Sequence, residues 1–187
     1  METPRSYALK EALFDRCLFE ALARIMEEKA LDRITVGDIV AEAHVSRASF
    51  YRRYRDKYDL LNATYERLLE ETLFTAESGT GWRDAIRKIY AIIGRNAAFF
   101  DRAFASCDRN SLRNFIFDRT LRLESDVLRR AGVQVEDPAV QYRLRAYVAG
   151  GLQLTVDWVA DGAHFPLEEL VDVLVEMVPT PFCAYFV

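Results

Sequence analysis

Residues 33–61, RITVGDIVAEAHVSRASFYRRYRDKYDLL, read as two short helices, a tight turn between them, and the start of a third helix. Thr35 and Asp38 have the spacing of a capping box, in which the hydroxyl accepts from a free N–H and the carboxylate reaches back. Ser46 has the character of a second N-cap. The turn between the helices is three residues long, 43–45, and this layout is typical of a helix-turn-helix.

The charge of this stretch differs from that of the rest of the chain. From His44 to Lys57 there are five cations against one acid, on a chain whose formal net charge is −4. Residues 1–60 carry eleven residues of each sign, so the basic excess is confined to this segment. A basic cluster on an acidic protein is typical of a phosphate-binding surface. The alternative is a solvated helix face with ordinary arginines.

The same stretch resembles the DNA-binding motif of the TetR family of transcriptional repressors. The residues that carry the resemblance are Ile34-Thr35, Asp38-Ile39, Ala43, Val45-Ser46, Ser49-Phe50-Tyr51, Tyr54, Lys57 and Leu60-Leu61. The sequence departs from the family pattern at His44, which stands where the family usually has Gly. That turn position often needs a positive φ, which Gly adopts freely and His only at some cost. We therefore expect a slightly strained turn that still forms the motif.

The resemblance implies that a helix from Ser46 to Tyr54 lies in the major groove of DNA. Arg47 is the best candidate for direct base reading, because its guanidinium matches the O6/N7 edge of guanine. The expected DNA-binding residues are Thr35, Gly37, Ser46, Arg47, Ala48, Ser49, Tyr51, Arg52, Arg53 and Lys57. Of these, Tyr51, Arg53 and Lys57 stand where the family's phosphate-contacting residues stand. Phe50 and Tyr54 are expected to be buried in the core. For Tyr51, burial in the core is the alternative to phosphate contact.

Length and composition limit the number of domains and argue against membrane, disulfide and metal-binding classes. The length of 187 residues fits one compact domain or a small domain with a larger one, and 51% of the residues are hydrophobic. The longest mostly apolar run, 146–156, is too short to span a bilayer, so we expect no membrane partner. Three distant cysteines argue against a disulfide framework and for the reduced cytoplasm. With two histidines and no paired-cysteine spacing, we expect no metal and no cofactor.

The hydrophobic pattern is helical throughout, which predicts an all-α fold of about nine helices. The predicted helices include 5–30, a helix from Asp56 to about 76, and 82–100, 108–131, 138–160 and 166–177, with a short helix or turn at 102–107. The clearest break in composition, Ser78-Gly79-Thr80-Gly81, places a domain boundary after the second of these helices. We expect a three-helix DNA-binding domain over 5–64, with its motif at 35–54, and a helical effector-binding and dimerisation domain over 65–187.

The helix predicted at 5–30 is expected to support the motif. Leu9, Leu13, Cys17, Ala21 and Ile25 recur at every fourth position, and Phe14, Leu18 and Leu22 widen this stripe. We expect these side chains to pack in the core against the helix-turn-helix.

Two apolar stripes lie on the last two predicted helices. Their residues are Tyr147, Gly151, Leu154 and Trp158 on one helix and Leu167, Leu170, Val171, Leu174 and Val178 on the other. Such helices either close the core of the monomer or pair with a second copy as a four-helix bundle. The resemblance places the dimer interface here. A homodimer also suits the motif, because two recognition helices about 34–36 Å apart reach successive major grooves.

The C-terminal half is rich in aromatic residues, and the resemblance implies that its helices hold a small apolar or amphipathic effector. Asn96, Asn114, Gln153 and Asp157 interrupt apolar stretches and are candidates to orient such a ligand. The alternative for the aromatic residues is ordinary core packing.

The sequence thus predicts a homodimeric repressor that binds a palindromic operator and is released by a small molecule. The second interpretation is a coregulator of the same fold that has lost DNA binding and acts through protein contacts. His44 favours this second interpretation, and the intact basic set argues against it. An enzyme is not expected, because the sequence has no nucleophile elbow, metal-ligand spacing or phosphate loop.

Overall fold

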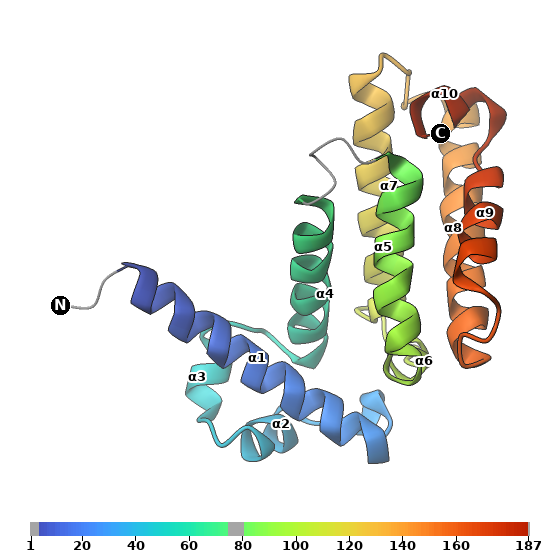
Figure 1. Ribbon diagram of the computed structural model, residues 1–187. Coiled ribbons are helices and arrows are strands. Elements are labelled where there is room, and N and C mark those ends of the chain that lie inside the picture. The colour runs from blue at the N-terminus through green and yellow to red at the C-terminus, as the bar shows by residue number, and fades with distance from the viewer. Residues whose placement is uncertain (1–3, 75–80, 187) are drawn as a thin grey trace.

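The computed structural model describes residues 4–74 and 81–186, and within these ranges the chain forms helices and turns with no strand. The all-α prediction is confirmed. The elements, drawn in Figure 1, are α1 (Pro4–Glu28), η1 (Leu31–Arg33), α2 (Val36–Glu42), α3 (Arg47–Tyr51), α4 (Lys57–Phe74), α5 (Trp82–Arg95), α6 (Ala97–Phe104), α7 (Leu112–Arg130), α8 (Pro138–Ala160), α9 (Leu167–Glu176), η2 (Thr180–Phe182) and α10 (Cys183–Phe186).

Two parts meet along α4. Figure 1 shows α1, α2 and α3 grouped around the lower end of α4, while α5, α7, α8 and α9 run side by side as a bundle. Helix α6 lies at the end of this bundle nearest to α1, with which it is in contact. Of the expected break at Ser78–Gly81, the first three residues lie outside the described residues. Among the described helices, none has the length and apolar character needed to cross a bilayer.

The support helix α1 buries most of the predicted apolar face. Leu18, Ala21 and Leu22 are buried as predicted, and Met26 is buried beside them, whereas Leu13 is 57% exposed. The prediction was wrong at Leu13, because a strict four-residue repeat drifts by about 40° per step around a helix of 3.6 residues per turn. Leu9 lies outside the residues whose side chains are described. The buried face of α1 instead includes a charged residue, Asp15.

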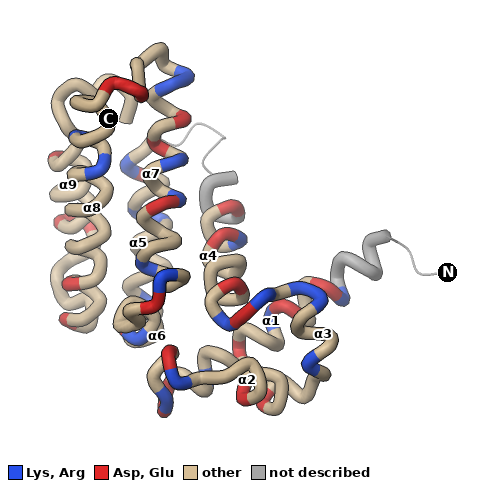
Figure 2. Tube along the Cα trace, turned by 180° about the vertical axis from the view of Figure 1, so that it is seen from behind, with Lys and Arg blue, Asp and Glu red and all other residues tan. Residues whose placement is uncertain are grey.

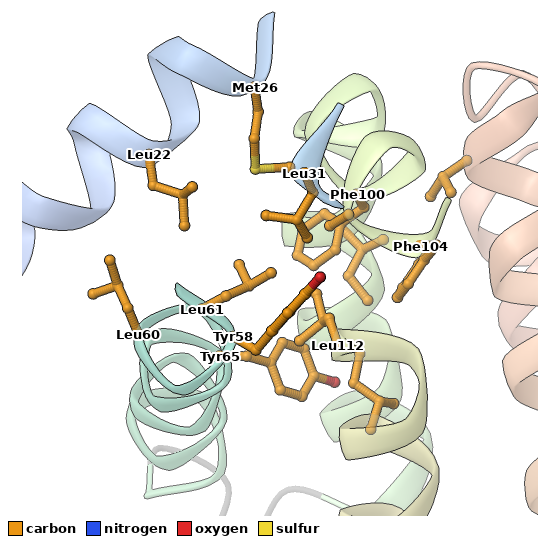
Figure 3. Close-up of a cluster of buried hydrophobic side chains, with 14 of the residues drawn as sticks. Leu22, Met26, Leu31, Tyr58, Leu60, Leu61, Tyr65, Phe100, Phe104 and Leu112 are labelled. Carbon is orange, nitrogen blue, oxygen red and sulfur yellow. The ribbon is translucent and has the colours of Figure 1, made fainter. Parts of the chain in front are cut away.

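A shared core joins the two parts, as Figure 3 shows. Its side chains come from four helices and the segment after α1, and they include Leu22, Met26, Leu31, Tyr58, Leu61, Tyr65, Phe100, Phe104 and Leu112. Because interiors are packed as densely as organic crystals, a shift of α6 against α4 must disturb the packing of α1 as well.

One predicted helix is divided in the structure. The pattern predicted a single helix over 82–100, but α5 ends at Arg95 and α6 begins at Ala97. Asn96 between them has φ −118° and ψ 30°, and its Nδ2 donates to the carbonyl oxygen of Ile92 at 2.8 Å. This side-chain bond competes with the helical pattern, which is a typical role of asparagine. Near the break, a Cβ on Gly94 would lie 2.6 Å from the Trp158 ring, so this glycine allows close packing.

The ends of α7 and the start of α8 are set by residues close by in the sequence. Asp137 caps α8 directly before Pro138, and Gly132, with φ 84°, follows the end of α7, both as predicted. Helix α7 begins at Leu112 rather than Asp108, because Ser111 caps it. The sequence did not predict η2 and α10, whose Phe182 and Phe186 are buried in a second cluster against α7 and α8.

Candidate functional site

Local caps fix both helices of the helix-turn-helix. Thr35 Oγ1 accepts from the backbone N–H of Asp38 at 3.1 Å, and Asp38 Oδ2 accepts from that of Thr35 at 2.8 Å. Hydrogen bonds from Lys29 and Thr35 lower the pKa of Asp38 to about 2. Ser46 Oγ accepts from the backbone N–H of Ser49 at 3.1 Å. The predicted capping box and second N-cap are therefore confirmed.

The turn contains the predicted strain. His44 has φ 54°, in the left-handed region that favours glycine. The turn closes nevertheless, because the backbone N–H of Val45 donates to the carbonyl oxygen of Val40 at 3.0 Å. The usual cost of a non-glycine residue in this region is about 1–2 kcal/mol. The histidine therefore strains the motif without breaking it.

The recognition helix α3 is shorter than predicted. It covers Arg47–Tyr51 rather than Ser46–Tyr54, with Arg52 as its C-cap. Phe50 and Tyr54 are buried, as expected for core residues. Tyr51 is 56% exposed, which excludes the core alternative for this residue in the isolated chain.

The outer side of α3 is basic and accessible. Ser46, Arg47, Ala48 and Arg52 are exposed, and Ser49 is half-buried. Figure 2 shows basic positions along α3 and the segment that leads from it into α4. This is the basic surface that the sequence located.

Arg47 lies against the first turn of α2. A Cβ on Gly37 would be 2.6 Å from Arg47 Nη2 and 3.3 Å from Thr35 Oγ1. Three of the predicted DNA-binding residues thus lie together: Thr35 and Gly37 at the start of α2, and Arg47 at the start of α3. The missing side chain at Gly37 leaves room for the guanidinium.

Arg53 points towards α1. Its Nη1 donates to Glu11 Oε1 at 2.7 Å, and its Nη2 donates to Asp15 Oδ2 at 2.8 Å. Arg67 on α4 donates to the same Asp15 oxygen at 2.9 Å. Ion pairing with these acids raises the pKa of Arg53, although burial acts in the opposite direction as the largest single effect. In this conformation Arg53 ties the end of α3 to the support helix.

Lys57 is also engaged within the protein. Its Nζ donates to the carbonyl oxygens of Asp32 and Ile34 at 2.9 and 2.8 Å, where it stabilises the end of η1. Burial lowers the pKa of Lys57. Arg53 and Lys57 therefore have structural partners in addition to the phosphate-binding role predicted for them.

A polar contact connects the part that contains the helix-turn-helix with the end of α6. The Asp32 carboxylate accepts a short hydrogen bond from Ser106 and a second from Tyr58 Oη at 2.9 Å. The bond from Ser106 is the largest cause of the lowered pKa of Asp32. Nearby, Asn62 Nδ2 donates to the carbonyl oxygen of Asn110 at 3.1 Å. Hydrogen bonds thus cross between the parts beside the shared core.

Most residues nominated for the dimer interface lie inside the single chain. Those buried in its own core are Tyr147, Gly151, Trp158, Leu170, Val171, Leu174 and Val178. Leu154 and Leu167 are partly exposed. The two stripes therefore pack in the monomer core, which was the alternative, and the outward faces of α8 and α9 consist of other residues, such as Tyr142 and Val173.

The bundle contains a cavity of about 130 Å³ between α4, α5, α7, α8 and α9. Its lining is largely apolar and aromatic, with Tyr65, Tyr90 and Tyr147 among the aromatic residues. Glu124 also lines it, 2% exposed, and its Oε2 has no hydrogen-bond partner among the described residues. Burial raises the pKa of this carboxyl to about 8. A second hollow, of about 540 Å³, lies between α1, α4 and α6.

The polar residues nominated for ligand contact do not line the bundle cavity. Asn96 borders the second hollow, and Asn114 donates to the backbone carbonyls of Asp108 and Arg109 in the turn before α7. Gln153 pairs with Arg113 and Asp157 on the exposed side of α8. Glu124 was not among the predicted site residues, because the nearby Arg122, Ser125 and Asp126 indicate an exposed helix face.

Comparisons with known families cover both parts of the chain. Residues 18–64 match the family described as "Bacterial regulatory proteins, tetR family". Residues 80–180 match the family described as "Transcriptional regulator C-terminal region". The second match alone covers more than half of the chain.

Individual relatives are distant. The HTH-type dhaKLM operon transcriptional activator DhaS of Lactococcus lactis is 23% identical over 101 residues, which cover 54% of each chain. The match therefore spans about half the length of that relative. A solved structure of the dihydroxyacetone kinase operon activator DhaS has a TM-score of 0.64 at 19% identity, covering 94% of this chain and 99% of that one. Thermus thermophilus FadR, a TetR-family repressor solved with lauroyl-CoA, has a TM-score of 0.54 at 18% identity, covering 88% and 92%.

Proposed function

Because this chain belongs to the TetR family of DNA-binding transcriptional regulators, we propose that it is a homodimeric repressor of a palindromic operator. We further propose that a small molecule bound in the C-terminal domain releases it from DNA. The observation that carries this proposal is the formed helix-turn-helix with an exposed basic α3.

In the proposed complex α3 enters the major groove, and Arg47 reads a guanine edge. Thr35 and Gly37, at the start of α2, contact a phosphate together with Ser46, Ser49, Tyr51 and Arg52. Ala48 allows close approach. The exposure of Arg47, Ala48, Tyr51 and Arg52 supports these roles. Arg53 and Lys57 can meet phosphate with donors that their internal partners leave unused, since guanidinium has five N–H donors and ammonium three.

The proposed dimer forms through α8 and α9. In the monomer their inward stripes are buried, so we assign the interface to the outward faces, with Leu154 and Leu167 at the margin. These faces expose apolar side chains that include Val173, at 37%, and Tyr142, at 76%. A second copy packed here makes a four-helix bundle and places two recognition helices on one duplex.

The effector proposal is supported by the cavity in the bundle, whose apolar lining and few polar groups are typical of ligand sites. The solved FadR complex with lauroyl-CoA supports a ligand-responsive role by analogy. An effector releases the protein only if it binds more tightly to a dimer geometry that no longer fits the operator.

Selection of bound sequences from a random duplex pool at about physiological salt tests the DNA proposal. We expect enrichment of a palindrome with half-sites about one helical turn apart. Folded, dimeric protein that enriches no sequence would instead indicate the coregulator function. A reporter gene behind the selected operator then separates repression from activation, which matters because DhaS is named an activator.

A further inference from the structure

We propose that the cavity between α4, α5, α7, α8 and α9 binds a small organic ammonium ion, whose charged group pairs with Glu124 and whose apolar body contacts the surrounding aromatic rings. This inference rests on the proposed effector-controlled function and names the chemical class of the effector.

The first argument is the unpartnered carboxyl. Glu124 is 2% exposed, and its Oε2 has no hydrogen-bond partner among the described residues. A buried polar atom without a partner is costly, and native proteins rarely keep one without a role. Since this atom belongs to a residue that lines a cavity, a ligand with a hydrogen-bond donor supplies what the protein lacks.

The second argument is charge. Arg119 is the cation among the lining residues, and its Nε is held by both carboxylate oxygens of Glu66, at 2.7 and 2.9 Å. It is therefore committed elsewhere and does not neutralise Glu124. A carboxylate is stable in such a place only with a positive partner, so a cationic ligand fits the site better than a neutral one.

The third argument is the aromatic lining. Tyr65, Tyr90 and Tyr147 surround the cavity from α4, α5 and α8. The faces of aromatic rings attract ammonium groups, and this attraction strengthens away from water. Tyr90 Oη is already bonded to Thr155 Oγ1 at 2.6 Å, and Tyr147 Oη donates to the Leu174 carbonyl oxygen at 3.2 Å. The hydroxyl hydrogens of both tyrosines are thus used within the protein, and Thr155 Oγ1 itself donates to the Gly151 carbonyl oxygen at 2.8 Å. The ring faces and the hydroxyl lone pairs remain available to a cationic ligand.

A second polar atom without a hydrogen-bond partner lies at the same cavity, and the cavity volume limits the size of the ligand. The buried Nε1 of Trp82 also has no hydrogen-bond partner within the described part of the chain, and Trp82 lines the same cavity. The cavity volume of about 130 Å³ limits the ligand. An apolar cavity of about 150 Å³ holds a molecule the size of benzene, so the body of the amine has roughly five or six heavy atoms.

Cyclopentylamine is the probe, and cyclopentanol is its neutral counterpart of equal size. In calorimetric titrations of the full chain at pH 8.5, we expect the amine to bind at least tenfold more tightly than the alcohol. Glu124→Gln should remove this preference, whereas Glu176→Gln, which changes an exposed carboxyl, should retain it. Equal affinity for amine and alcohol, or unchanged amine affinity in Glu124→Gln, would overturn the proposal. A thermal melt shows whether each variant is folded.

The wild-type protein offers an independent test that needs no variant. Glu124 must ionise to pair with the ammonium ion, and its pKa in the empty protein is about 8. Amine affinity should therefore fall about tenfold for each pH unit below 8, and alcohol affinity should stay constant. The tyrosine hydroxyls that face the cavity do not titrate in this range. Burial raises the pKa of Tyr65 and Tyr147 and brings that of Tyr90 to about 12, and Arg119 remains paired. Amine affinity independent of pH would contradict the assignment.

Operator binding separates this inference from the proposed function. If the protein binds its selected operator but does not prefer the amine to the alcohol, the DNA-binding proposal stands and the ammonium proposal is wrong. If the amine binds through Glu124 and operator affinity is unchanged, the site is confirmed and release by this effector class is wrong. Both binding through Glu124 and loss of operator affinity would support the two proposals together.

Discussion

Arg53, just beyond the recognition helix, lies with its Nε 2.7 Å from Oδ1 of Asp15 on the support helix. The side chain of Asp15 is only 7% exposed, so this ion pair is far less screened than one at the surface. We expect Arg53→Ala to lower the free energy of unfolding by about 1–3 kcal/mol, because it leaves a buried charge with fewer partners. Urea denaturation measures this. Arg52→Ala, an exposed neighbour, should change it by less than about 0.5 kcal/mol, and equal effects would contradict the structural role of Arg53.

Replacing the strained histidine should stabilise the protein. His44→Gly removes the cost of a positive φ, and we expect a gain of up to about 1 kcal/mol in the free energy of unfolding. Ala163 has φ 58° and offers a matched control away from the DNA-binding motif. Ala163→Gly should give a similar gain in thermal melts without altering DNA affinity. Destabilisation by both substitutions would show that neither turn is strained.

Gly37→Ala should weaken operator binding while leaving the fold intact. The new Cβ would lie 2.6 Å from Arg47 Nη2, so the guanidinium must move from its position beside α2. Alanine is also the better helix former, so stability should not fall. We expect a several-fold loss of affinity in fluorescence anisotropy. In an Arg47→Ala background the same substitution should have little further effect, and additive losses would exclude coupling between the two positions.

The proposed dimer face can be tested with two neighbouring valines. Val171 is fully buried, whereas Val173 is 37% exposed. Val173→Glu should give a folded monomer in analytical ultracentrifugation, because it places a charge on the outward face of α9. Val171→Glu should instead unfold the bundle, because it buries an unpaired charge. A Val173→Glu protein that remains dimeric would move the interface away from this face.

Glu124 should make stability depend on pH. Its folded pKa of about 8 lies above its ordinary value of 4.5, so the folded state binds more protons than the unfolded state between these values. The contribution of this group to stability is therefore fully present below about pH 4.5 and is lost as pH rises, by roughly 1.4 kcal/mol per unit up to about pH 8. Glu124→Gln should flatten this slope in denaturation curves recorded from pH 5 to 8. An unchanged slope would show that another group causes it.

The helix-turn-helix was predictable because its signals are local. Thr35 with Asp38, and Ser46 with Ser49, lie three residues apart, so caps and turn follow from the order of side chains alone. The boundary at Pro138 was predictable for the same reason. Such signals can be recognised in the sequence without knowledge of the rest of the fold.

The predictions that failed depend on contacts between distant segments. Leu13 belongs to an apolar stripe, but the position of α2 and α4 decides which side of α1 is covered. The seven buried residues of the α8 and α9 stripes show the same limit, since periodicity indicates an apolar face but not what covers it. The burial of Glu124 arises where α4 and α8 pack against α7, which the nearby Arg122, Ser125 and Asp126 do not indicate.

Helix α4 contributes Lys57 to the DNA-binding part at one end and Leu69 to the cavity lining towards the other. Its 18 residues make a rod about 27 Å long. A rotation of such a rod by 10° about its midpoint moves each end by roughly 2 Å. Base-reading hydrogen bonds tolerate a few tenths of an ångström, so a ligand that tilts α4 by this angle acts through leverage, and its own cavity need change very little.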